Sequence, residues 1–129
     1  MKIIAGIFFA AVNLLYASMF GGPIDGTAWD VKVKQDGFFH WSSKNDTLVF
    51  HGGKAVIAGE IAQGYAPALY ESDAENGATA FSLVLAGDGH DPVEWSGRVE
   101  GERIAGSVVV RGRDGRTRRF TFSGARKTG

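Results

Sequence analysis

The tightest group of side chains able to bind a metal ion or move a proton lies in the segment GDGHDP, which contains Asp88, His90 and Asp91. A metal site needs about three or four donors that converge on one point. A single short loop does not supply that convergence, and aspartates in such a loop commonly bond their own backbone. We therefore expect a polar turn here, with no metal and no cofactor.

The serines show no pattern typical of nucleophilic catalysis, which requires a nucleophile beside an oriented base. Ser42 and Ser43 follow His40 closely, but no serine lies in a strand-to-helix elbow. We expect no catalytic residues and a protein that is not an enzyme. A hydrolase or metal-dependent enzyme centred on His90 and Asp91 remains an alternative.

Aromatic residues in two long connections are the better candidates for a binding site. Aromatic side chains in loops at the mouth of a barrel commonly contact ligands. The alternative is that they only cover the end of the barrel as hydrophobic lids. We predict a shallow site for a small apolar or aromatic ligand at Phe38, Phe39, Trp41, Tyr65 and Tyr70.

The charges sum to zero, which gives no support to binding of nucleic acid. They are unevenly spread: residues 1–97 carry 5 Lys/Arg against 11 Asp/Glu, and residues 98–129 carry 9 against 3. In a closed sheet the last strands lie beside the first, so these charges can pair across strands. The alternative is a basic surface for a protein partner, formed by Arg113, Arg116 and Arg119.

The first 22 residues have one lysine followed by an apolar run over residues 3–20, the pattern of a secretory signal. We expect a signal peptide or signal anchor over residues 1–22 and one domain over residues 23–129. The protein is then periplasmic or extracellular, or held in the membrane by an uncleaved signal. The absence of cysteine excludes disulfides and thiolate sites.

From Trp29 onward the apolar residues alternate with polar ones, and the chain has 19 glycines, as expected for short strands joined by tight turns. Nearly every link is short and sequential, which favours a closed eight-stranded antiparallel up-and-down β-barrel over a sandwich. The fold class is therefore all-β. We expect strands at residues 29–34, 47–51, 54–62, 69–75, 78–85, 93–99, 104–111 and 117–125.

Three glycines surround the hairpin that follows Trp95. Strand parity places Gly97 and Gly106 on the inward face, where glycine leaves room for a large neighbour, and Gly101 in the turn, where a positive φ is useful. No helix follows them, so a phosphate-binding loop is not expected.

Arg118 shares the inward parity of the last strand, a costly position unless the guanidinium is stacked, paired or open to solvent. If the barrel closes, Trp29 in the first strand is a candidate platform for it. Large side chains crowd the predicted interior, so we expect no deep cavity: Trp29, Phe50, Trp95, Phe120 and Phe122.

The first strand begins with Gly-Thr-Ala-Trp (residues 26–29), and an arginine lies near the end of the chain. Broadly, these two features resemble lipocalins and avidins. The chain also contains a series of further motifs: Trp-x-Val-x-Val (29–33), Asp-Thr-Leu-x-Phe (46–50) with Gly-Gly-Lys (52–54), the Pro-Ala-x-Tyr loop (64–70), the glycine hairpin (95–106) and Phe-x-Phe-x-Gly (120–124). More narrowly, residues 26–124 with these motifs resemble small exported bacterial proteins of lipocalin-like (calycin-type) fold and no established function. The resemblance implies a barrel and export, and it implies no activity.

Overall fold

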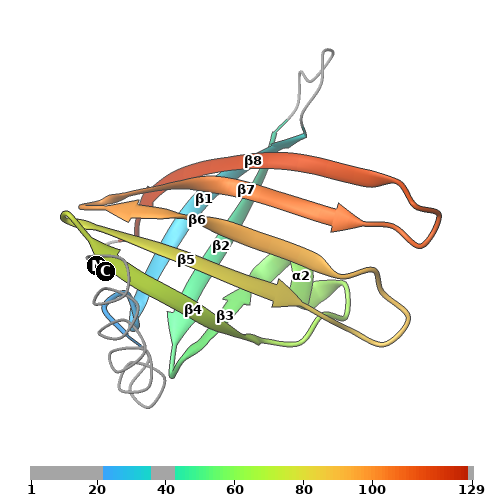
Figure 1. Cartoon of the computed structure of the whole chain (residues 1–129), viewed down its shortest axis with the longest axis horizontal. Helices are drawn as coiled ribbons and strands as arrows, with labels where there is room; N and C mark the ends of the chain where they lie inside the picture. The colour runs from blue at the N-terminus through green and yellow to red at the C-terminus, as the bar shows by residue number, and fades with distance from the viewer. Residues whose placement is uncertain (1–21, 36–42, 128–129) are drawn as a thin grey trace, which may run out of the picture.

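The computed structural model describes residues 22–35 and 43–127, and within these ranges eight strands form a closed antiparallel barrel (Figure 1). Each strand pairs with the next, and β8 closes the sheet on β1. The predicted all-β, eight-stranded up-and-down barrel is confirmed. Its elements are β1 (Thr27–Gln35), β2 (Lys44–His51), β3 (Lys54–Ile57), α2 (Ala58–Ala62), β4 (Ala68–Glu75), β5 (Ala78–Leu85), β6 (Val93–Glu100), β7 (Arg103–Arg111) and β8 (Thr117–Arg126).

The predicted end of the third strand was wrong, because that strand was expected to run over residues 54–62. It ends at Ile57 and continues as the five-residue helix α2. The helix has no side-chain cap of its own, but the Asp46 carboxylate on β2 accepts the N–H of Gly59 at 2.8 Å. An acceptor from a neighbouring strand thus satisfies a helix donor that would otherwise lack a partner. The described residues contain no helix long and apolar enough to span a membrane.

The two ends of the barrel differ in their connections. We call the end with the β2–β3, β4–β5 and β6–β7 hairpins the closed end, because its turns are tight. Gly52 and Gly53 both have positive φ, and so do Asn76 and Gly77, as a two-residue type I′ turn requires. Gly101 has a φ of 58°, which confirms its predicted place in a turn. The longer connections gather at the opposite, open end.

Aromatic side chains fill the interior above the closed end. The ring of Phe50 lies 4.8 Å from that of Tyr70 and 5.0 Å from that of Phe81, measured between centroids. Phe122 continues the series, with its centroid 4.9 Å from that of Trp95. Among the described residues, these rings pack on one another through the interior from the closed end up to Trp95.

Two of the glycines that follow Trp95 in the sequence make room for Phe122. Gly97 and Gly106 lie directly opposite each other on β6 and β7. A Cβ at Gly97 would lie 3.0 Å from the Phe122 Cζ, and one at Gly106 would lie 2.8 Å from its Cε1. Both glycines therefore face inward, as predicted, and the large neighbour that they accommodate is Phe122.

The predicted stacking of Arg118 on Trp29 is wrong. The register places Trp29 opposite Arg126, whereas Arg118 is opposite Val110 at the open end. Trp29 is buried near the closed end, where its indole N–H donates to the Thr27 Oγ1 at 2.9 Å. Arg118 is instead exposed at the open end.

Several of the C-terminal cations pair with acids, as the charge distribution suggested. The Arg111 Nε lies 2.6 Å from the Glu94 Oε2 across β7 and β6, and the Lys127 Nζ lies 3.7 Å from the Asp30 Oδ1 on β1. These pairs are exposed, so each stabilises the barrel by no more than about 1 kcal/mol.

Candidate functional site

A pocket of about 400 Å³ opens at the open end of the barrel, and we call it the mouth pocket. Inward positions of β1, β2, β6, β7 and β8 form its walls, with α2 and Tyr65 at the side. The lining residues are Val33, Gln35, Ser43, Lys44, Asp46, Glu60, Gln63, Tyr65, Val93, Trp95, Val108, Val110, Arg118 and Phe120.

The lining changes from apolar to polar along the barrel axis. In β8, Phe122 is buried, Phe120 is half-buried and Arg118 is exposed, although all three share one face. In β2, Leu48 is likewise buried, while Asp46 is half-buried and Lys44 is exposed. The pocket therefore has an apolar interior and a charged rim, the usual composition of a site that binds a small organic molecule.

Trp95 belongs to the lining and marks the depth at which the aromatic filling begins. Its side chain is 2% exposed and packs against Phe122. Its indole N–H is buried without a hydrogen-bond partner in the described chain. This contrasts with the buried indole of Trp29, which donates to Thr27.

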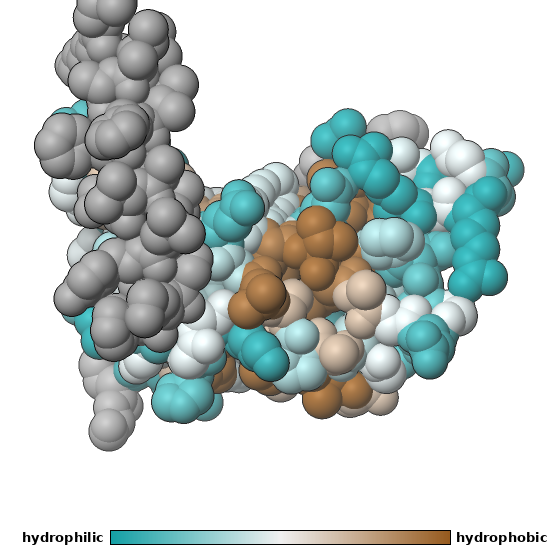
Figure 2. Space-filling model, turned by 60° about the horizontal axis from the view of Figure 1, so that its bottom comes forward, coloured by the Kyte–Doolittle hydropathy of each residue, from teal (hydrophilic) through white to brown (hydrophobic). Residues whose placement is uncertain are grey.

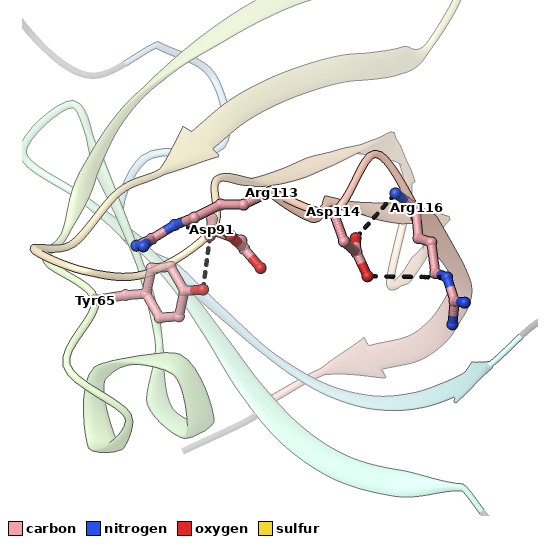
Figure 3. A network of polar contacts seen from close by, with 5 residues as sticks. All are labelled: Tyr65, Asp91, Arg113, Asp114 and Arg116. Carbon is pink, nitrogen blue, oxygen red and sulfur yellow. Dashed lines mark hydrogen bonds and ion pairs between the residues drawn. The ribbon is translucent and has the colours of Figure 1, made fainter.

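Tyr65 joins the loops of the open end. The end of α2 holds it, because the Glu60 carbonyl accepts the N–H of Tyr65 at 3.0 Å. Its hydroxyl donates to the Asp91 carbonyl at 2.7 Å, and the Asp91 carboxylate lies 3.5 Å from the Arg113 Nε. In Figure 3 these three side chains gather where the loops meet, and Arg116 points away from them. Tyr65 is thus at the mouth, as predicted, and is a buried part of its wall.

Two acidic groups of the pocket have pKa values above their ordinary ranges. Burial raises the pKa of the Glu60 carboxyl, Lys44 opposes the rise, and Asp46 adds to it. Burial also raises the pKa of the Tyr65 hydroxyl, with Glu60 and Asp91 adding to the rise and Arg118 opposing it. The charged groups of the rim therefore act on one another: Lys44 and Asp46 act on Glu60, and Arg118 acts on Tyr65.

The sequence-based prediction missed Lys44, Asp46 and Glu60. The second strand was expected to begin at residue 47, so the first two were assigned to a loop. Their parity with Leu48 and Phe50 would have placed them inward had the strand been extended. No local pattern marks Glu60, because its position depends on the α2 turn.

Tyr70 was predicted at the mouth, and this was wrong. It packs on Phe50 near the closed end, and its hydroxyl donates to the Asp25 Oδ1 at 3.0 Å. Burial, together with the hydrogen bond to Asp25 and the negative charge of that carboxylate, raises the Tyr70 pKa well above its ordinary value. Burial alone would raise the pKa of Asp25, but N–H donors from Gly53 and Gly52 and the Tyr70 hydroxyl outweigh it, so the pKa is lowered. This cluster holds the closed end together.

The other predicted ligand residues, Phe38, Phe39 and Trp41, lie outside the described residues. The segment with Asp88, His90 and Asp91 forms the β5–β6 loop. The ring of His90 lies 4.9 Å from that of Tyr65, measured between centroids. Within residues 22–35 and 43–127, no group of three or more His, Asp or Glu side chains is arranged to hold a metal ion.

The three arginines predicted to bind a partner do not form one patch. Arg113 and Arg116 lie in the β7–β8 loop, where they pair with Asp91 and Asp114. Arg119 lies on the outer face of β8, which the loop arginines do not share. It borders an outer groove of about 790 Å³ over β4 to β8 that also includes Leu69 and Val84.

The outer groove is partly apolar. Leu69 on β4 is 73% exposed and Val84 on β5 is 52% exposed. Serines at positions 82, 96 and 107 lie opposite one another on three successive strands and line this groove. Figure 2, turned toward the lower side of Figure 1, shows hydrophobic side chains gathered in a hollow with hydrophilic ones around it.

Comparisons of the chain with protein-family models, with curated proteins and with solved structures found no significant match.

Proposed function

We propose that this protein is a non-catalytic binding module that takes one small apolar or aromatic molecule into its mouth pocket. The observation that carries the proposal is the change of filling along the barrel. Aromatic rings occupy the interior from the closed end up to Trp95, and above it the inward residues leave about 400 Å³. That volume lies within the range of about 300–1,000 Å³ found for small-molecule sites.

The geometry of the open end supports a preformed site. Tyr65 and Asp91 tie the α2–β4 and β5–β6 loops together, and Arg113 adds the β7–β8 loop. A pocket whose walls are already fixed loses little conformational entropy when it binds a ligand.

Two adjacent valines of β7 provide a test of this proposal. Val110 lines the mouth pocket, whereas Val109 lines the outer groove. With 1-anilinonaphthalene-8-sulfonate as a fluorescent probe, Val110→Trp should weaken binding at least about tenfold by filling the pocket, and Val109→Trp should leave it unchanged. Circular dichroism and thermal unfolding control for folding of both variants. Equal binding by Val110→Trp and wild type, or loss only in Val109→Trp, would place the apolar site elsewhere.

Docking of another protein is a second candidate function, and the exposed Leu69 and Val84 beside Arg119 favour it. Arg113 and Arg116 support it less, because each has an acidic neighbour. Under this alternative, Arg116→Glu with Arg119→Glu abolishes an oligomer or a complex in sedimentation velocity while the fold stays intact. If the double variant kept the oligomer and the complex that the wild type forms, the result would count against the docking function.

We further propose that the protein is an exported bacterial barrel of lipocalin-like, calycin-type fold. The support is the motif resemblance, together with the apolar run over residues 3–20. The intact mass of the protein from an expressing cell tests export: loss of about the first 22 residues indicates cleavage, as expected of a signal peptide. The full mass in the membrane fraction indicates an anchor, and the full mass in the cytoplasm contradicts export.

A further inference from the structure

Arg118 is a cation of the mouth pocket that has no acid partner among the described residues. Three arginines earlier on β7 and in the β7–β8 loop, Arg111, Arg113 and Arg116, instead pair with Glu94, Asp91 and Asp114. Arg118 shares the inward face of β8 with Phe120 and lines the pocket rim. The guanidinium therefore stands where the polar end of a bound molecule would leave an apolar pocket.

The acids of the rim are directed to other groups. Asp46 accepts the N–H groups of Thr47 and Gly59, each at 2.8 Å. Glu60 lies within the electrostatic range of Lys44 and Asp46, and burial disfavours its charged form. Lys44 acts electrostatically on the Glu60 carboxyl, whereas Arg118 forms no ion pair with an acid of the described residues and can meet an anion.

Trp95, which lines the mouth pocket, carries a second polar group, its indole N–H. Its N–H is a donor with no acceptor function, it is buried, and it has no partner in the described chain. Trp95 is 2% exposed and belongs to the pocket lining. Buried donors are nearly always satisfied in proteins, so this N–H points to an acceptor supplied from outside the described chain.

The two features lie at different depths. Trp95 pairs with Val108 and Val108 with Phe120, which puts the tryptophan and Phe120 at one level. Arg118 is two residues nearer the open end, which corresponds to about 7 Å along the strand. At the level of Arg118 the wall is apolar on β6 and β7, where Val93 pairs with Val110 and Val110 pairs with Arg118.

We infer that the ligand of the mouth pocket is an amphipathic anion. Its carboxylate or sulfonate meets the Arg118 guanidinium at the rim, its flat apolar body lies between the valines and Phe120, and an oxygen at its inner end accepts the Trp95 N–H. The inference rests on the proposed binding function and narrows its ligand to one chemical class.

Three synthetic probes separate these contributions: 6-acetyl-2-naphthoate, 6-isopropyl-2-naphthoate, which lacks the acceptor, and the methyl ester of the first, which lacks the charge. Titration followed by tryptophan fluorescence should rank the acetyl acid tightest. Charge-assisted hydrogen bonds are roughly twice as strong as neutral ones, so Arg118→Gln should weaken the two acids about tenfold and leave the ester unchanged. Arg119→Gln is the matched control: it is adjacent on the same strand, faces outward, and should alter none of the three.

Trp95→Phe should remove the preference for the acetyl over the isopropyl acid. Because this variant also reduces packing on Phe122, the indole N–H resonance of the wild type gives an independent readout. The acetyl acid should shift the Trp95 N–H signal downfield, and the isopropyl acid should not.

The outcomes distinguish this inference from the function on which it rests. Equal binding of the three probes, with no effect of Arg118→Gln, would overturn the anion and leave a general apolar site. If Arg119→Gln weakened binding of the two acids, their site would be the outer groove, and this result would also overturn the inference. If none of the three probes bound, and the fluorescent sulfonate bound Val110→Trp as well as wild type, the mouth site itself would be refuted.

Discussion

Replacing Gly106 with alanine tests how closely the barrel wall packs on Phe122. Gly106 on β7 lies directly opposite Gly97 on β6. An added Cβ would collide with the Ser96 carbonyl oxygen and would lie 2.6 Å from the Gly97 Cα and 2.8 Å from the Phe122 Cε1. Carbon atoms in contact normally lie about 3.5–4.0 Å apart. The two strands must therefore separate by about 1 Å, or the ring must leave its place.

The atoms around Gly106 also indicate how much stability Gly106→Ala should lose. Overpacking a core usually costs about 1–3 kcal/mol, and two of the three obstructing atoms belong to the backbone and cannot rotate away. We expect the free energy of unfolding to fall by about 3 kcal/mol for Gly106→Ala. In a domain of this size that loss lowers the Tm by roughly 12 °C or more. Urea and thermal unfolding followed by circular dichroism measure both quantities.

Ser107→Ala is the matched control, because Ser107 is the next residue of β7 and faces outward toward Ser96. It should change the free energy of unfolding by less than about 0.5 kcal/mol. Adding Phe122→Leu to Gly106→Ala should recover little, since the backbone contacts remain. A loss below about 1 kcal/mol for Gly106→Ala, or complete recovery in the double variant, would refute the rigid-wall explanation.

Three further predictions concern titrating groups. Because burial raises the pKa of Glu60, ionisation of this carboxyl opposes folding as the pH rises above the ordinary value of 4.5. Glu60→Gln should therefore stabilise the protein at pH 7 by less than about 1 kcal/mol, since solvent screens the charge. Urea unfolding should show that this gain vanishes near pH 4. Because the pKa of Asp25 is lowered in the folded protein, its carboxylate stabilises the fold above the ordinary pKa of 3.8, and this effect is lost as the pH falls. The difference in unfolding free energy between wild type and Asp25→Ala should therefore shrink below pH 3.8. Tyr65 and Tyr70 have raised pKa values and resist ionisation near pH 10. An absorbance titration should therefore show that these two tyrosines ionise only in urea or on alkaline unfolding. If all three tyrosines of the chain ionised near pH 10 in the folded protein, the burial of these two would be contradicted.

Alternation along single strands was enough to predict the barrel and its glycines. The inward positions of Gly97 and Gly106 follow from the side-chain period of two, and the positive φ of Gly101 follows from its place between two strands. These features depend on neighbours in the sequence, which is why local reasoning identified them.

The features that were wrong or missed depend on contacts between distant strands. The pairing of β8 with β1 is shifted so that Arg126 faces Trp29, and no single strand reveals that shift. The end of β3 depends on an acceptor from Asp46, 13 residues earlier in the chain. Tyr70 was assigned to the mouth from the length of its loop, but Asp25 holds it at the closed end.

The closure of β8 on β1 also determines how the molecule can be attached to anything else. The N–H of Lys127 donates to the Ala28 carbonyl at 2.8 Å, so the described chain enters and leaves side by side at the closed end. A fluorophore, affinity tag or second domain joined directly at Gly22 or Lys127 would lie at the opposite end of the barrel from Arg118 and Tyr65. A circular permutant that joins Gly22 to Lys127 and opens the chain at a hairpin turn should keep the barrel, because the new ends would lie outside every strand pair.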